Sequence, residues 1–206
     1  MQIYKFITCP IQVNTYLAFD ETKKGFIVDP GGYSLQLTET VRKGGIDVEY
    51  IILTHGHGDH ISGVEDFLRD FPKAKVVAYV QEREMLKDPH LNESLGICGK
   101  AVSLEADQYV NDRDTLKIGN TELTFVHTPG HTKGGMCIMA DGCVFSGDTL
   151  FRASIGRTDF YGGDFSEIIR SIKEKLFVLP DNTIVYPGHM SETTIGYEKE
   201  HNPFVR

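Results

Sequence analysis

The sequence predicts a mixed α/β fold, and three patterns support this prediction. Residues 50–53 form a short, apolar, β-branched run, which is typical of a strand buried on both faces. An amphipathic helix pattern over residues 34–43 lies between this run and a strand pattern at 26–28, which makes a strand–helix–strand unit. Two hairpin signals in the second half, around residues 119–120 and 141–142, add antiparallel strands.

The N-terminal half alternates strand and helix patterns. Residues 2–7, 15–19 and 26–28 cluster or alternate apolar side chains, so we expect antiparallel strands that build a sheet edge. The helix over 34–43 should stop at a Gly-Gly pair, and one over 61–68 has apolar residues at helical spacing with a proline beyond its end. The other elements expected here are a strand at 75–80 and a short helix at 81–88, while residues 90–100 carry a weak signal and stay unassigned.

The C-terminal half repeats this organisation without repeating the sequence. Apolar residues at helical spacing over 164–179 predict a packed helix, and a short helix is expected over about 192–200. The strands expected in this half are 115–118, 122–126, 136–139, 143–145 and 183–186.

Length and charge limit the classes of function. No run of Gly, Ser, Pro or like charge divides the 206 residues, so we expect a single domain over residues 1–206. The net charge of -8 and the pI near 5.5 argue against a nucleic-acid partner, whose binding depends on clustered Lys and Arg. No stretch approaches the ~20 apolar residues of a membrane helix, and no signal-peptide pattern opens the chain. We therefore expect a cytoplasmic protein without a membrane partner.

The four cysteines do not form a CxxC pair or a zinc-finger spacing. They are Cys9, Cys98, Cys137 and Cys143. The last two lie in apolar strand patterns, so we expect buried free thiols there.

The strand at 50–53 is followed by a cluster of potential metal ligands. Three histidines and one aspartate lie within six residues: His55, His57, Asp59 and His60. Imidazole and carboxylate groups are ligands that zinc, iron and manganese accept. Glycine tolerates backbone angles that other residues avoid, so we interpret Gly56 and Gly58 as residues that let this loop fold back. A chance cluster in a surface loop is the alternative, and the buried strand directly before it argues against that.

Three strands of the second half are also followed by candidate ligands in Gly-containing turns. These are His131, Asp148 and His189. If the strands lie side by side in stacked sheets, all four turns can meet at one end. Five His and two Asp are too many for one tetrahedral zinc and suit two metals that share a bridging carboxylate and a bridging water. The alternative that some of these residues have only a structural role stays open. Three other histidines lack this setting, and we leave them out: His90, His127 and His201.

The pattern Thr-His-x-His-x-Asp-His at 54–60, with these three ligands downstream in order, resembles the metallo-β-lactamase fold superfamily. Within it, residues 148–151, the Gly-Arg-Thr-Asp element at 156–159 and the Tyr-Pro-Gly-His element at 186–189 with its tail resemble the short glyoxalase II-like hydrolases. Full-length glyoxalase II carries an additional C-terminal helical domain that supplies much of its glutathione recognition, whereas 17 residues follow His189 here.

The resemblance implies a four-layer αββα sandwich with the site at the sheet ends. It assigns His55, His57 and His131 to one metal and Asp59, His60 and His189 to a second, with Asp148 as the bridge. The cofactor implied is a pair of divalent ions, Zn²⁺ first, with Fe or Mn also suited to these ligands. Asp29 resembles an early aspartate of the family that orients a ligand imidazole, and capping a turn is the comparable alternative.

We therefore expect a binuclear metallohydrolase acting on a small-molecule thioester such as S-2-hydroxyacylglutathione. A metal-bridging hydroxide would attack the carbonyl beside the catalytic carboxylates Asp59 and Asp148. The thiolate would leave without obligatory protonation. The alternatives are a lactonase or other ester hydrolase on the same metal core, a mononuclear iron persulfide dioxygenase using His55, His131 and Asp148, and a non-catalytic metal-bearing scaffold.

Candidate substrate contacts are Arg157, Lys133 and Tyr161. For Arg157 we favour a buried structural arginine paired with a carboxylate over an anion-binding role. Lys133 and Tyr161 could reach the mouth of the site, with surface and core roles as alternatives. Metal identity and oligomeric state stay open.

Overall fold

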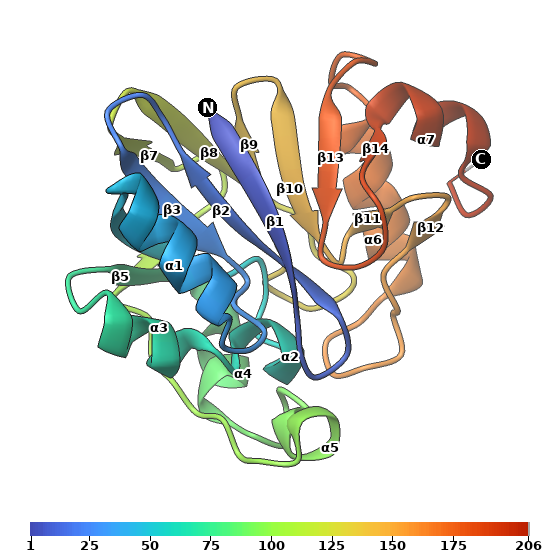
Figure 1. Cartoon of the computed structure of the whole chain (residues 1–206). Helices are drawn as coiled ribbons and strands as arrows, with labels where there is room; N and C mark the ends of the chain where they lie inside the picture. Colours follow the sequence, from blue (N-terminus) through green and yellow to red (C-terminus); the bar gives the residue numbers. More distant parts are fainter. Residues whose placement is uncertain (206) are drawn as a thin grey trace.

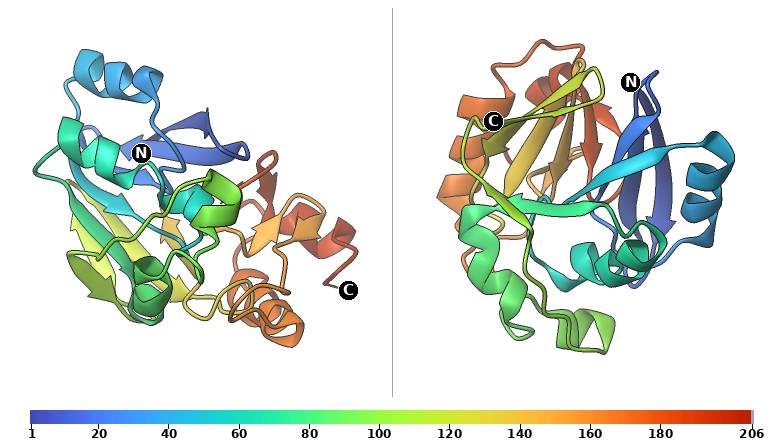
Figure 2. Two further views of the ribbon diagram at one scale, coloured as in Figure 1. Left: turned by 90° about the horizontal axis from the view of Figure 1, so that it is seen from below. Right: turned by 90° about the vertical axis from the view of Figure 1, so that its left-hand side faces the viewer.

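The computed structural model describes residues 1–205 and shows two stacked β-sheets between layers of helices (Figure 1). Helix α1 (Leu35–Gly44) lies on one side of the sheets and helix α6 (Phe165–Ser171) on the other, as the right-hand view of Figure 2 shows. This order of layers confirms the predicted αββα sandwich.

The first sheet has the strand order β1-β2-β3-β4-β5-β6 within the described residues. Its strands are β1 (Gln2–Thr8), β2 (Val13–Phe19), β3 (Lys24–Val28), β4 (Asp47–Ile52), β5 (Lys75–Tyr79) and β6 (Gln108–Val110). The first three pair antiparallel, as predicted, and β3 to β6 pair in parallel. Strand β6 was not predicted, because three residues are too few to show a period-2 pattern.

The second sheet has the order β14-β13-β10-β9-β8-β7 over the same part of the chain. Its strands are β7 (Thr115–Ile118), β8 (Thr121–His127), β9 (Met136–Ala140), β10 (Cys143–Gly147), β13 (Ile184–Pro187) and β14 (Thr193–Thr194). A separate small hairpin joins β11 (Leu150–Phe151) to β12 (Ser154–Ile155). The two-residue strands β11, β12 and β14 were not predicted, for the same reason as β6.

Three predicted helices are divided in the structure, since the one expected over 81–88 begins as a 3-10 turn and continues as an α-helix. The helix expected over 61–68 is α2 (Gly58–Ile61) followed by α3 (Val64–Asp70), and the break falls at Gly63, whose N–H donates to the Pro30 carbonyl at 2.8 Å. The helix expected over 164–179 is α6 followed by the π-helical segment η2 (Ile172–Leu176). The remaining helices are the 3-10 turn η1 (Val80–Glu82), α4 (Arg83–Lys87), α5 (Ser94–Cys98) and α7 (Ile195–His201).

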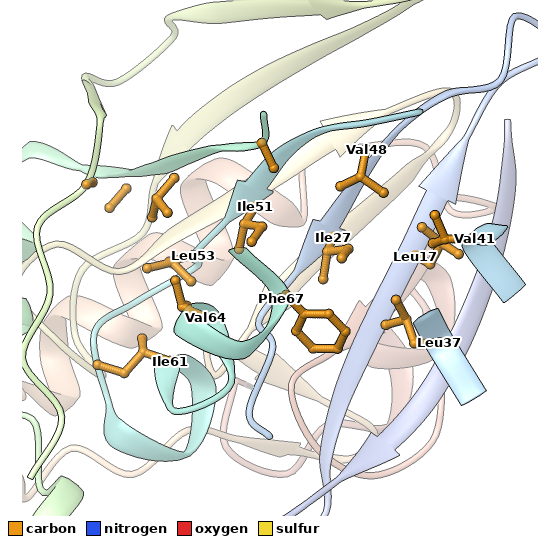
Figure 3. Close-up of a cluster of buried hydrophobic side chains, with 14 of the residues drawn as sticks. Leu17, Ile27, Leu37, Val41, Val48, Ile51, Leu53, Ile61, Val64 and Phe67 are labelled. Atoms are coloured by element: carbon orange, nitrogen blue, oxygen red, sulfur yellow. The ribbon is translucent and has the colours of Figure 1, made fainter. Parts of the chain in front are cut away.

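The strand that precedes the histidine cluster is buried on both faces, as predicted. Ile51 packs with Leu37 and Phe67 between the first sheet and its helices, in the cluster of side chains that Figure 3 shows. The next residue, Ile52, packs with Phe145 in the layer between the two sheets. Burying one such side chain stabilises the fold by about 1.5–3 kcal/mol, so this strand is held from both sides. A third layer of apolar side chains joins the second sheet to α6, η2 and α7.

Each of the four cysteines is free within the described chain, and Cys137 and Cys143 are buried, as predicted. Among residues 1–205, every helix is too short or too polar to cross a lipid bilayer.

Candidate metal centre

The seven candidate ligands come from four connections that follow strands. His55 and His57 follow β4, and Asp59 and His60 lie in α2 directly after them. His131 lies between β8 and β9, Asp148 follows β10 and His189 follows β13. The structure brings these residues together: six of them belong to groups whose potential ligand atoms lie within 4.8 Å of one another, and Asp148 lies within 3.7 Å of three of those six.

The first cluster consists of His55, His57 and His131. One nitrogen from each ring lies within 4.8 Å of the others, and all three residues are buried. His57 Nδ1 and His131 Nε2 are 2.9 Å apart. Three imidazole nitrogens at this spacing suit one face of a metal ion.

The second cluster consists of Asp59, His60 and His189, which also offer ligand atoms within 4.8 Å of one another. Asp59 Oδ2 lies 3.4 Å from His60 Nε2 and 3.2 Å from His189 Nε2. A carboxylate and two imidazoles are again ligand types that divalent transition metals accept.

Asp148 lies between the two clusters. Its Oδ1 is 3.4 Å from His60 Nε2 of the second cluster. Its Oδ2 is 3.6 Å from His131 Nε2 of the first cluster and 3.7 Å from His189 Nε2 of the second. Each carboxylate oxygen therefore faces at least one candidate ligand, and the side chain spans the gap between the clusters.

Several buried polar atoms of this centre lack hydrogen bonds. Among residues 1–205, the buried side-chain atoms without a hydrogen-bond partner are His55 Nε2, His57 Nε2, His60 Nε2 and Asp148 Oδ1. Leaving such a group unpaired costs about 1–3 kcal/mol, and buried polar groups in native proteins are nearly always paired. All four belong to the centre, so the donor set fits bound divalent cations.

Burial lowers the pKa of every imidazole in the first cluster. It takes the pKa values of His55 and His57 well below the usual histidine value, and the neighbouring imidazoles add to the effect. The pKa of His131 is lowered by the same cause, although Asp148 opposes it. These rings are neutral at physiological pH, which is the form that binds a metal.

The second cluster has the opposite electrostatic character. Burial disfavours the charged form of His60, but the carboxylates of Asp59, Asp148 and Asp29 outweigh it and raise its pKa to about 10. Burial also opposes ionisation of Asp59, yet His60 and His189 outweigh it and hold the pKa of that carboxyl well below its usual range. This half of the centre carries excess negative charge that a cation would neutralise.

Asp29 contacts a candidate ligand directly, in the way that the resemblance implied. Its Oδ2 is 2.9 Å from His60 Nδ1 and accepts a hydrogen bond from Thr54 Oγ1 at 2.6 Å. Thr54 Oγ1 is in turn 3.1 Å from His55 Nδ1. When Nδ1 of each ring carries the proton, its Nε2 lone pair is free to bind a metal.

A cleft of about 460 Å³ opens onto both clusters. Arg157 lines this cleft, but the prediction that it is buried was wrong: its side chain is 64% exposed. The predicted pairing is present, because Nε and Nη2 donate to the two oxygens of Asp159 at 2.9 and 2.8 Å. The connection after β12 runs over the surface, where water solvates the guanidinium.

The other two candidate substrate contacts point elsewhere. Lys133 and Tyr161 are exposed and lie together, with Lys133 Nζ 5.9 Å from the centre of the Tyr161 ring. The Tyr161 hydroxyl donates to Glu84 at 3.1 Å. Neither side chain is among the described residues that line the cleft.

Comparison with known proteins identifies the family. The model of the metallo-beta-lactamase superfamily matches residues 10–189, which include all seven candidate ligands. The chain belongs to this superfamily. The chain is 36% identical over 203 residues to a relative, the hydroxyacylglutathione hydrolase GloC of Haemophilus influenzae. The match covers 94% of this chain and 93% of GloC.

Two solved structures resemble this one. The crystal structure of the BLEG-1 B3 metallo-beta-lactamase matches with a TM-score of 0.93 and 37% identity, over 99% of each chain. The structure of TTHA1623 in a di-iron-bound form matches with a TM-score of 0.84 and 29% identity, over 98% of this chain and 99% of that one.

The sequence analysis did not identify Glu82, whose side chain joins two loops that carry candidate ligands. Its Oε2 accepts from the Gly56 N–H at 2.7 Å, and its Oε1 accepts from Thr132 Oγ1 and the Gly134 N–H at 2.8 Å each. The side chain is buried, which raises its pKa, while these three hydrogen bonds oppose the rise. A weak signal was present: Glu82 shares helical spacing with two buried apolar residues, Met85 and Leu86.

The interpretation of the two motif glycines needs correction. Neither Gly56 nor Gly58 has a positive φ, so unusual backbone angles are not what requires glycine there. A Cβ at Gly56 would lie 2.8 Å from Glu82 Oε2, and one at Gly58 would lie 2.5 Å from the Cα of Ser94. Packing against the Ser94 backbone excludes a side chain at Gly58, and a side chain at Gly56 would displace the Glu82 carboxylate that accepts from its N–H.

Proposed function

We propose that this chain is a binuclear metal-dependent hydrolase of small-molecule thioesters. The observation that carries the proposal is the position of Asp148 between the two clusters, which together with Asp148 contain every buried side-chain atom without a hydrogen-bond partner among residues 1–205. The relationship to a hydroxyacylglutathione hydrolase supports the thioester as the substrate class.

The first cluster would hold one metal ion and the second cluster the other, with Asp148 shared. Zn²⁺ is the ion we propose first, and the di-iron form of a similar structure makes iron the main competitor. Divalent ions lower the pKa of a bound water towards ~7 and polarise a carbonyl oxygen, which is the chemistry that ester and thioester hydrolysis need.

The chain's own residues would orient the ligand imidazoles and keep a carboxylate ionised at the centre. Asp29 and Thr54 hold the protons of His60 and His55 on Nδ1, away from the metal-facing side. The low pKa of Asp59 keeps its carboxylate ionised beside the reacting centre. A thiolate has a conjugate-acid pKa of about 8.5 and leaves without a proton donor, so a site built from ionised carboxylates and neutral imidazoles suits a thioester better than an amide.

Metal analysis combined with a substrate panel tests this proposal. We expect two metal ions per chain and hydrolysis of thioesters ahead of lactones, other esters and lactams. One iron per chain with thiol-dependent oxygen uptake would instead identify a persulfide dioxygenase and overturn the proposal. Faster hydrolysis of lactones than of thioesters would keep the metal centre but replace the substrate class.

A further inference from the structure

The wall of the cleft around the metal centre is apolar. Apart from the candidate ligands, Arg157 and Ser154, the described residues that line it are Ile11, Ile97, Phe151, Ile155, Phe160 and Met190. They come from the turn between β1 and β2, from α5, from the β11–β12 hairpin and the segment after it, and from the turn after β13. Side chains from distant parts of the chain thus meet at one opening.

Two of these side chains are strongly exposed. Ile11 is 50% exposed and Met190 is 58% exposed. Single exposed apolar residues are ordinary on a protein surface, but these two face a cleft that also contains Phe151 and Ile155. A bound apolar group would remove them from water, which favours binding in proportion to the apolar surface buried.

The cleft offers little to a charged substrate. Among the described residues that line it, Arg157 is the only Lys or Arg, and two of its nitrogens already donate to Asp159. Lys133 lies outside this lining. A glutathione thioester carries two carboxylates and one ammonium group, and burying such charges without partners is unfavourable.

We infer that the preferred substrates are uncharged thioesters with an apolar acyl chain, ahead of thioesters of a charged thiol such as glutathione. This inference rests on the proposed thioester hydrolysis. In that reaction the carbonyl carbon gains the water oxygen and loses its bond to sulfur, and the products are a carboxylic acid and a thiol. The apolar wall would hold the acyl chain while the carbonyl faces the two clusters.

Steady-state kinetics of the metal-loaded protein with matched thioesters test the inference. One series places acyl chains of increasing length on N-acetylcysteamine, a neutral thiol, and a second places the same acyl groups on glutathione. We expect kcat/KM to rise about 3- to 4-fold per added methylene until the cleft is filled, which corresponds to the transfer free energy of one CH₂ group. At equal acyl length, the neutral thiol should be preferred.

Ile11 and Ile7 provide a matched pair of variants. Both are exposed isoleucines of the β1–β2 hairpin region, at 50% and 58%, but only Ile11 is among the described residues that line the cleft. Ile11→Ser should lower kcat/KM about 3- to 10-fold for long acyl chains, and by a larger factor for these than for the acetyl thioester, in line with the lost apolar contact. Ile7→Ser should leave kcat/KM unchanged for both the long-chain and the acetyl thioesters. Thermal unfolding of both variants checks that they fold.

The outcomes separate the inference from the proposed function. Equal or faster hydrolysis of the glutathione thioesters, or a kcat/KM independent of chain length, would overturn the inference and leave the thioesterase intact. Hydrolysis of no thioester by protein that holds its metals would overturn both. Equal effects of the Ile11 and Ile7 variants would show that the apolar wall does not select the acyl chain.

Discussion

The two clusters of the centre differ in charge and in how their ligands are held. The first cluster consists of three imidazoles whose pKa values are all lowered by burial. The second contains an ionised carboxylate and an imidazole whose pKa is raised. A different buried acid supports the ligands of each cluster. Glu82 joins the loops of the first cluster without contacting an imidazole, whereas Asp29 contacts His60 of the second cluster directly.

This difference indicates that the clusters depend on different features of the fold. The first needs the correct distance between two loops, since His55 and His57 flank Gly56 on one loop and His131 lies on the other. The second needs the correct proton position on one ring, because Asp29 selects which nitrogen of His60 faces inward. Substitutions at Asp148, Asp29 and Glu82 should therefore have separable effects.

Removal of the shared carboxylate should have the largest effect. Asp148→Ala should weaken metal binding in both clusters by more than about 100-fold, because even the loss of a group that only orients a ligand costs about 10- to 100-fold. Metal content and thioester turnover should fall together. The exposed His90 supplies the control, and His90→Ala should change neither quantity. A variant at Asp148 that retains two metals and normal turnover would refute its place between the clusters.

Asp29→Asn should affect the second cluster more strongly than the first. The new amide can place an N–H donor opposite His60 Nδ1, which favours the tautomer with its proton on Nε2 and blocks the atom that faces the centre. We expect about 10- to 100-fold weaker binding of the second metal and a smaller loss at the first, because Asp29 reaches His55 only through Thr54. Titration of metal-free protein with Zn²⁺ measures both steps. Equal weakening of the two steps would contradict the separate roles.

The two clusters should also respond differently to pH. In metal-free protein the His60 pKa of about 10 means that this ring carries a proton at pH 7 to 9, which a metal must displace. Metal affinity of the second cluster should therefore rise about 10-fold per pH unit over this window and level off near pH 10. The first cluster, whose rings are already neutral, should show little change. Calorimetry in buffers with different ionisation enthalpies would report about one proton released by the second metal, and no such release would contradict the assignment.

Glu82→Gln should have the smallest effect of these changes. The amide removes acceptor capacity beside Gly56, Thr132 and Gly134, and one unpaired buried donor costs about 1–3 kcal/mol. We expect a loss of about that size in the unfolding free energy of the metal-free protein, with about 10-fold weaker binding at the first cluster.

The matched control for this change is Glu84→Gln, because Glu84 is exposed and accepts only from Tyr161 in the described contacts. Chemical denaturation and metal titration of both variants provide the comparison. A second cluster weakened more than the first by Glu82→Gln would show that Glu82 does not act through the loops it joins.

Most of the secondary structure was predictable from local patterns. Longer strands such as β2 and β8 and the helix α1 carry periodicities that burial of one face or both faces requires. The errors fall where the local pattern is too short, as at β6, or where a distant contact interrupts a helix, as at Gly63. The exposure of Arg157 was also missed, since a paired arginine has the same sequence signature whether buried or exposed.

The sequence by itself determined which candidate ligands gather at one end of the sheets, because residues that directly follow strands are placed there by local geometry. Only the tertiary structure decided how those residues are supported and what surrounds them. Glu82 lies 50 residues from Thr132 along the chain. Asp29 lies 31 residues from His60, and only the resemblance to the family pointed to it. Contacts over such separations depend on how the sheets and loops pack, and no local pattern encodes them. The apolar wall of the cleft has the same origin, since Ile11 and Met190 meet there only after both sheets have formed.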